Sequence, residues 1–169
     1  MKKTLALVLA LCMVFALCAC GKTAAPAETP AEEAAPASLA VCPASEPDTL
    51  DPALNSAVDG ATMVAHLFSG LAKWSQNEEG ALVIVSDLAK ELVEGVVNED
   101  GTVTYTYALR EGAKWSDGKD VTAGDFEFAW KRAASEELAA DYGYMFEIVK
   151  GYPNDLAVTA IDDSTLEVT

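Results

Sequence analysis

Residues 110–132, REGAKWSDGKDVTAGDFEFAWKR, constrain the fold more than any other part of the chain, because an extended segment, a turn and a helix start follow one another closely. Residues 113–115 are expected to be extended. Ser116-Asp117-Gly118 has turn chemistry, with a glycine that can adopt positive φ. Thr122 is the expected N-cap, and Asp125 completes a capping box three residues later. The stretch predicts a strand, a turn and a helix.

The helix predicted over residues 122–134 has one apolar face. Its apolar residues recur with helical spacing: Phe126, Ala129, Trp130 and Ala133. We expect Phe126, Trp130 and also Trp115 to lie in the core, and we expect no catalytic residue in this stretch.

Several motifs follow one another along the chain. They are SEPDTLDP at residues 45–52 with LFSGL at 67–71, KWSDGKDVTAGDF at 114–126, and AIDDSTLEVT at 160–169. In order and spacing they resemble the family 5 extracellular solute-binding proteins of ABC importers, whose best-known members bind oligopeptides. The resemblance covers roughly residues 39–169.

This resemblance implies an α/β fold of the two-lobed, periplasmic-binding-protein type, in which the lobes close over a ligand by hinge motion. We expect only the amino-terminal part of that fold here. Residues 39–68 would begin lobe I, and residues 69–169 would form a truncated, small additional α+β lobe. The opposing lobe and hinges would belong to several hundred further residues, so the chain is expected to be a fragment.

The first residues predict a lipoprotein signal peptide over residues 1–19. Two lysines precede an apolar run at residues 5–17, which is too short to span a bilayer as a stable helix. The following LCACG, residues 17–21, resembles a bacterial lipobox, in which Cys20 would be lipidated and become the mature amino terminus. The alternative is ordinary secretory cleavage beside an incidental cysteine.

Residues 20–38 predict a disordered tether, because three prolines stand among Ala, Glu and Thr and no large apolar residue is present. A segment that folds on binding is the alternative. After processing, Cys42 would be the only cysteine left without lipid, so no intramolecular disulfide is expected. We expect Cys42 to be a small buried residue.

The charge is strongly acidic, with 27 acidic and 11 basic residues and a formal net charge of −16. Loss of Lys2 and Lys3 with the signal peptide would make it −18. Such a charge argues against nucleic acid as a partner and against electrostatic attraction to an anionic membrane. Attachment to the extracytoplasmic face of the bacterial membrane would therefore depend on the lipid at Cys20.

The resemblance also implies ligand-binding residues. By their position in the motif, Asn55, Ser56, Ala57 and Val58 match a loop that lines the cleft, where small residues let a peptide backbone approach. An ordinary solvent loop is the alternative. Tyr142 matches a ligand-facing tyrosine of peptide-binding members, and an ordinary exposed or core aromatic is equally compatible with its position.

Local patterns predict the remaining elements coarsely. They are a strand at residues 39–42, a helix from about Thr62, a polar turn at 74–80, a hairpin of 94–97 with 103–109, and two strands at 156–161 and 165–169. His66 is expected to be a packed or solvated surface residue.

No cofactor, metal or catalytic site is expected. Asp117, Asp162 and Asp163 are expected in turns and Asp125 at a helix start, and these residues and Asp120 do not have the ligand spacing of an EF-hand. The chain also has a single histidine and no nucleophile or phosphate-binding motif. The resemblance implies a non-enzymatic importer component that passes oligopeptides to ABC permease and ATPase subunits. A nickel chelate, haem, a sugar or a signalling peptide could replace the oligopeptide. A non-transport surface lipoprotein, or a hydrolase with catalytic residues elsewhere, are alternatives of another class.

Overall fold

The computed structural model describes residues 38–42 and 45–169. In it, the helix predicted after the turn at residues 116–118 is α3, Ala123–Ala134. The predicted capping box is present, and the amide of Thr122 donates to Oδ2 of Asp125 at 2.7 Å. Gly118 adopts a φ of 89°, and the amide of Trp115 donates to the carbonyl of Lys119. The predicted order of extended segment, turn and helix is confirmed.

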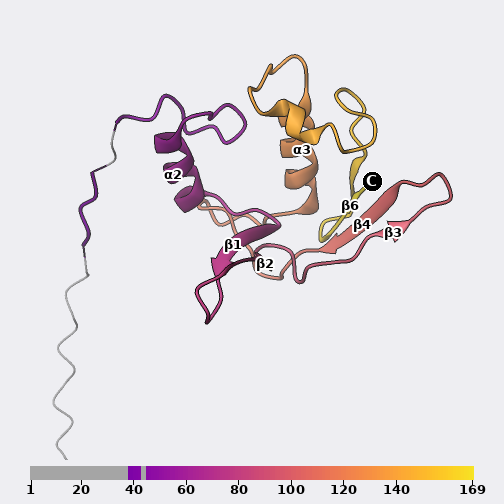
Figure 1. Ribbon diagram of the computed structural model, residues 1–169, viewed down its shortest axis with the longest axis horizontal. Helices are drawn as coiled ribbons and strands as arrows, with labels where there is room; N and C mark the ends of the chain where they lie inside the picture. Colours follow the sequence, from indigo (N-terminus) through magenta and orange to yellow (C-terminus); the bar gives the residue numbers. More distant parts are fainter. Residues whose placement is uncertain (1–37, 43–44) are drawn as a thin grey trace, which may run out of the picture. The chain divides into compact units, whose positions relative to one another are not determined.

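α3 packs against a four-stranded antiparallel sheet with strand order β3-β4-β6-β5 (Figure 1). The strands are β3 Val96–Val97, β4 Val103–Ala108, β5 Val158–Asp162 and β6 Thr165–Val168. The predicted hairpin and the two predicted last strands are confirmed. The sheet brings the last strands of the chain beside β4, because β6 pairs with β4 from Ala108↔Thr165 to Tyr105↔Val168.

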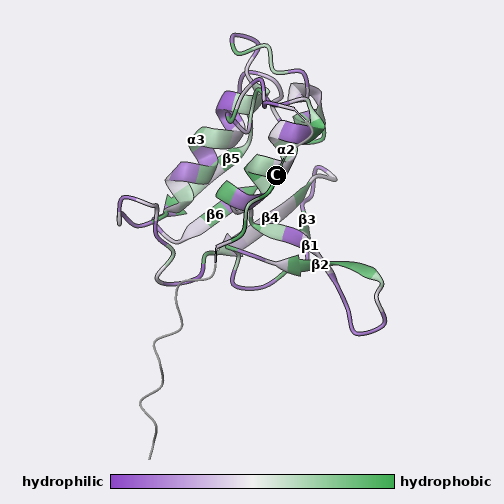
Figure 2. Cartoon of the chain, turned by 90° about the vertical axis from the view of Figure 1, so that its left-hand side faces the viewer, coloured by the Kyte–Doolittle hydropathy of each residue, from purple (hydrophilic) through white to green (hydrophobic). Residues whose placement is uncertain are grey.

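The core lies between α3 and the sheet, where Phe126 packs with Val158 and Leu166. Figure 2 shows α3 beside β5 and β6, with hydrophobic and hydrophilic residues distributed around the helix. The ring of Trp130 is half-buried and lies 5.6 Å from that of Phe146, so the expectations for Phe126 and Trp130 are confirmed.

The core prediction for Trp115 is wrong, because 43% of this residue is exposed. Its indole nitrogen donates to Oδ2 of Asp125 at 3.3 Å, so the ring lies over the start of α3 and outside the apolar cluster. A polar ring nitrogen with a surface carboxylate as partner gains little from burial.

The remaining elements are α2 Val58–Leu67, β1 Ala72–Gln76, β2 Leu82–Ser86 and the 3-10 helix η1 Gly143–Phe146. α2 begins four residues before the predicted start at Thr62. The turn predicted over residues 74–80 is shorter, because Trp74 pairs with Ile84 between β1 and β2. β1 and β2 form a separate two-stranded sheet.

The strand predicted at residues 39–42 is absent, and Cys42 is exposed rather than buried. A strand needs a neighbour for its amides and carbonyls, and no strand pairs with these residues in the described part of the chain. The predicted signal peptide and nearly all of the predicted tether lie outside the described residues. Among the described residues, no helix has the length and apolarity needed to cross a membrane.

Candidate functional site

The loop that precedes α2 is organised by the carboxylate and carbonyl of Asp51. Oδ1 of Asp51 accepts from the amide of Ala53 at 3.0 Å, and its carbonyl accepts from the amide of Asn55, also at 3.0 Å. The amide of Asp51 donates to Oγ1 of Thr49. An aspartate that accepts from an amide two residues later closes a local turn, which directs the chain toward residues 55–57.

Asn55 has a structural role in this loop. Its side-chain nitrogen donates to the carbonyl of Ala57 at 3.1 Å, and its Oδ1 lies where a Cβ on Gly60 would collide with it. Gly60 is buried, and only glycine leaves room for the half-buried Asn55. The asparagine therefore fixes the entry into α2.

The structure places the four predicted ligand residues in two settings. Asn55, Ser56 and Ala57 lie in the loop, whereas Val58 is the first residue of α2 and is largely exposed. Ala57 has an extended backbone, with φ −112° and ψ 153°. Within residues 45–169 the amides of Ser56 and Ala57 donate to no protein acceptor. Extended backbone with available amides is what strand-like pairing with a peptide requires.

Tyr142 lies at the N-cap of η1, and 48% of it is exposed. Its ring is 6.2 Å from that of Tyr144, and its hydroxyl has no hydrogen-bond partner among the described residues. Close packing holds this segment against α3, because a Cβ on Gly143 would lie only 3.0 Å from the carbonyl of Ala133. An exposed phenol on a fixed backbone can stack on one group and bind another.

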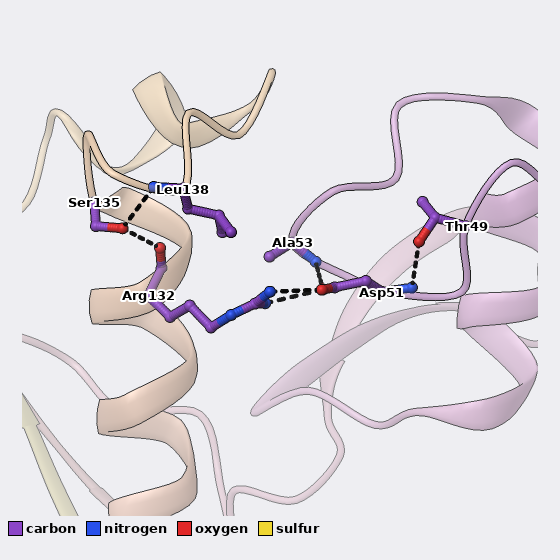
Figure 3. A network of polar contacts seen from close by, with 6 residues as sticks. All are labelled: Thr49, Asp51, Ala53, Arg132, Ser135 and Leu138. Carbon is purple, nitrogen blue, oxygen red and sulfur yellow. Dashed lines mark hydrogen bonds and ion pairs between the residues drawn. The ribbon is translucent and has the colours of Figure 1, made fainter.

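One ion pair connects the loop at residues 49–57 to the end of α3. Figure 3 shows the Arg132 guanidinium reaching across to the Asp51 carboxylate in a two-pronged contact, with Nη1 3.0 Å from Oδ1 and Nη2 2.6 Å from Oδ2. The hydrogen bonds from Arg132 lower the pKa of Asp51, while the same carboxylate raises the pKa of Arg132. Each partner is stabilised in its charged form.

The network continues from Arg132 toward the segment that carries Tyr142. Oγ of Ser135 donates to the carbonyl of Arg132 at 2.8 Å and accepts from the amide of Leu138 at 3.3 Å (Figure 3). The end of α3 thus supports both candidate segments. Among the described residues, however, no hydrogen bond or ring contact joins residues 55–58 directly to Tyr142.

Comparison with known proteins identifies the family. Residues 83–169, more than half of the chain, match the model of the bacterial extracellular solute-binding proteins, family 5 Middle. The chain belongs to this family.

Three similar proteins are described as binding peptides or, in one case, probably deoxycholate. The oligopeptide-binding protein OppA of Bacillus subtilis is 34% identical over 134 residues, which is 73% of this chain and 23% of the relative. The probable deoxycholate-binding periplasmic protein YgiS of Escherichia coli is 36% identical over 136 residues, 74% of this chain and 24% of the relative. The crystal structure of Haemophilus influenzae OppA in complex with the peptide RPPGFSPFR superposes with a TM-score of 0.58 at 32% identity, over 73% of this chain and 25% of that one.

These matches bear out the sequence-based assignment to family 5 and the mixed α/β, periplasmic-binding-protein fold, of which the chain forms a part. The chain spans about a quarter of the length of the relatives it matches. Family 5 consists of solute-binding proteins, which agrees with the prediction that the chain is not an enzyme.

The aspartates that the sequence assigned to turns have that role in this family 5 chain. Oδ1 of Asp117 accepts from the amide of Lys119, and Oδ1 of Asp162 accepts from the amide of Ser164 at 2.8 Å. The Lys119 side chain, and after it the Lys119 amide, lowers the pKa of Asp117, and the Ser164 amide lowers the pKa of Asp162. No group of three or more His, Cys, Asp or Glu side chains suited to a metal ion occurs among the residues that the structure describes.

Two open pockets among the described residues contain none of the predicted ligand residues in their lining. A pocket of about 540 Å³ lies beside the Lys150–Asp100 ion pair, and one of about 420 Å³ lies along α3 beside Phe128 and Arg132. The candidate ligand residues therefore lie outside these two pockets.

Sequence reasoning missed Asp51 and Arg132, although both stand inside motifs that it used. Asp51 belongs to the opening motif at residues 45–52, and Arg132 is the last residue of the stretch 110–132. The two residues are 81 positions apart, so no spacing rule could pair them. The available signal was a carboxylate in a turn and a planar cation in the last turn of a helix, each suited to two-pronged pairing.

Proposed function

We propose that this family 5 chain belongs to the substrate-binding component of an ABC importer, which captures oligopeptides outside the cell and delivers them to a membrane permease driven by ATPase subunits. The observation that carries the proposal is the shared fold and 32% identity with a relative solved in complex with a nine-residue peptide. The extended backbone at Ala57, between the exposed residues Ser56 and Val58, supports it, since a peptide backbone can pair there.

Calorimetric titration of the complete receptor with di-, tri- and longer peptides of mixed sequence tests this function. We expect saturable binding that depends weakly on side-chain identity, because backbone pairing is insensitive to side chains. A receptor that binds none of these peptides would contradict the proposal.

A different ligand is the second candidate, because one relative of 36% identity is described as probably deoxycholate-binding. Deoxycholate offers no backbone amides, so it would need an apolar surface instead of the strand-like contacts proposed here. Titration with deoxycholate under the same conditions separates the two. Tight binding of the bile acid without any peptide affinity would favour this second candidate. The nickel chelate, haem, sugar and signalling-peptide alternatives are separated in the same way.

We assign the ligand contacts to Asn55, Ser56, Ala57, Val58 and Tyr142. The unpartnered amides of the loop and the exposed phenol support this assignment. Tyr142→Phe should weaken peptide binding only through the lost hydroxyl, whereas Tyr142→Ala also removes the ring. Equal peptide affinity in all three proteins would exclude Tyr142 from the site.

We further infer that residues 1–19 are a lipoprotein signal peptide, that lipid on Cys20 anchors the protein to the extracytoplasmic face of the membrane, and that residues 20–38 form the tether. The domain boundaries at 39–68 and 69–169 are part of the same proposal. Labelled palmitate should enter the wild-type protein and the control Cys18→Ser, but not Cys20→Ser. Labelling of Cys20→Ser would refute the anchor.

A further inference from the structure

The segment of residues 45–69, which contains α2 and the candidate ligand loop, makes few contacts with the rest of the fold. α2 packs against no other helix or strand among the elements of the described chain. Gly60 is the one buried residue of α2. Apolar burial, which normally fixes a helix in place, therefore contributes little to the position of this one.

The Asp51–Arg132 ion pair instead fixes the position of this segment relative to α3. Within the described residues, its two hydrogen bonds are the only ones between residues 45–69 and residues 72–169. Beyond the end of α2 the chain is fixed separately, because the carbonyls of Gly70 and Leu71 accept from the amides of residues 87–89. The ion pair therefore holds the side of the segment that carries the loop. The backbone of Arg132 is fixed because it lies in the last turn of α3, which is packed on the sheet. A cation in the last turn of a helix also interacts favourably with the helix dipole.

The geometry of this pair differs from that of the other ion pairs. Its side chains are 34% and 27% exposed, whereas those of Lys119 and Asp117 are 80% and 53% exposed. Exposed single contacts between charges contribute little, but a two-pronged arginine–carboxylate contact fixes both distance and orientation. Oδ1 of Asp51 also accepts from the amide of Ala53, so the same carboxylate shapes the loop and anchors it.

We propose that Arg132 is a positioning residue that acts through Asp51 to hold the loop of residues 51–57 in its ligand-competent conformation. This inference rests on the proposed function, in which the loop contacts the ligand. Arg132 itself contacts no ligand in this mechanism. Its guanidinium fixes Asp51, whose carbonyl accepts a hydrogen bond from the amide of Asn55. The resulting turn leads into the extended backbone at Ala57.

Amide hydrogen exchange of the 169-residue chain without ligand tests the positioning role. In Arg132→Gln, we expect the amides of residues 53–55 to exchange about tenfold faster, while those of β4 and β6 keep their protection, because only local opening is facilitated. Lys131→Gln is the matched control. It removes an ion pair of similar length, Lys131–Glu127 at 2.7 Å, which lies within the same helix and should leave residues 53–55 unchanged.

Asp51→Asn removes the negative charge of the pair and leaves Arg132 in place. The amide oxygen can still accept from Ala53, so a local increase in exchange there reports the lost pairing with Arg132 and not a lost turn. The double variant should exchange no faster than either single variant. Unchanged exchange at residues 53–55, or faster exchange spread evenly over β4 and β6, would overturn the proposal.

Measurement of peptide binding by the same variants separates this inference from the proposed function. In the complete receptor, Arg132→Gln should weaken peptide binding about tenfold, since the loop must be ordered on binding, and Arg132→Lys should recover part of that loss. If the wild-type receptor binds no peptide, the proposed function fails, and the exchange measurement still decides the positioning role.

Discussion

Residues 123–169 and residues 45–67 are held in place by different forces. In the first region, α3 buries Phe126 against β5 and β6, and Gly143 lies close to the helix backbone. In the second region, α2 buries only Gly60 and is connected through Asp51. Apolar packing has no charge to titrate or to screen, whereas an ion pair responds to pH and to ionic screening.

This difference divides the candidate site. Tyr142 depends on the packed region, because Trp130 and Phe146 hold η1 against α3. Residues 55–57 depend on a charged contact. A fold built in this way can loosen one candidate segment without disturbing the other. The following predictions test that separation in order of decreasing effect.

The largest effect is expected in the packed region. Leu166 is fully buried, and Leu166→Ala should lower the free energy of unfolding by about 3 kcal/mol through lost transfer energy and a cavity. Urea unfolding followed by circular dichroism measures it. Ile148→Ala is the control, since Ile148 is 88% exposed and its loss should be below about 0.5 kcal/mol. Equal losses in both variants would mean that the core lies elsewhere.

The threonine that caps α3 and the threonine inside α2 should differ in what they contribute to stability. Thr122→Ala removes the capping-box hydroxyl of α3 and should cost about 1 kcal/mol. Thr62→Ala in α2 removes only a bond from Oγ1 to the carbonyl of Val58 and introduces a better helix former, so it should cost nothing. Thermal unfolding of both variants compares them. A larger loss in Thr62→Ala would contradict this contrast.

Acid should affect the loop through Asp51. Its folded-state pKa is lowered from 3.8, so its contribution is complete above pH 3.8 and is lost as pH falls through the lower folded value. Protection of the amides at residues 53–55 should fall over this interval. The carboxyl group of Glu127, which accepts from the amide of Ala160, also has a lowered pKa and titrates in the other region.

The control for acid is Arg132→Gln, in which the pKa of Asp51 returns toward its usual value. The loss of protection at residues 53–55 should then shift to higher pH. An identical pH profile in wild type and variant would show that the pair does not determine the behaviour of the loop.

The smallest effect on overall stability is expected for Gly60→Ala. Alanine is the better helix former by about 1 kcal/mol, but its Cβ displaces the Asn55 side chain, so the two effects should nearly cancel. The side-chain amide resonances of Asn55 should move, while unfolding changes little. Unmoved Asn55 resonances would show that the loop accommodates the methyl group elsewhere.

Local patterns predicted the packed region well. The capping box at Thr122 and the apolar spacing of Phe126 and Trp130 act between near neighbours in sequence, and the structure has both of them. Tertiary context decided the rest. Trp115 forms a polar contact with Asp125 at the surface, and Trp74 is in a strand because Ile84 pairs with it.

The candidate site was less accessible to sequence reasoning. Family resemblance supplied residues 55–58 and Tyr142. It could not show that Val58 begins a helix, or that the Asn55 side chain donates to the carbonyl of Ala57 and lies against Gly60. The connection between the two segments depends on Asp51 and Arg132, which become neighbours only after the chain has folded.

Because Trp130 contacts Phe146, the fluorescence of Trp130 should respond to changes in the segment that carries Tyr142. Trp74 and Trp115 are open to water and should emit at long wavelength, whereas the half-buried indole of Trp130 should emit further to the blue. With Trp74 and Trp115 replaced by phenylalanine, the emission maximum of Trp130 would report directly on movement of the segment that carries Tyr142. Ligand capture could then be followed in a stopped-flow fluorimeter without any attached dye.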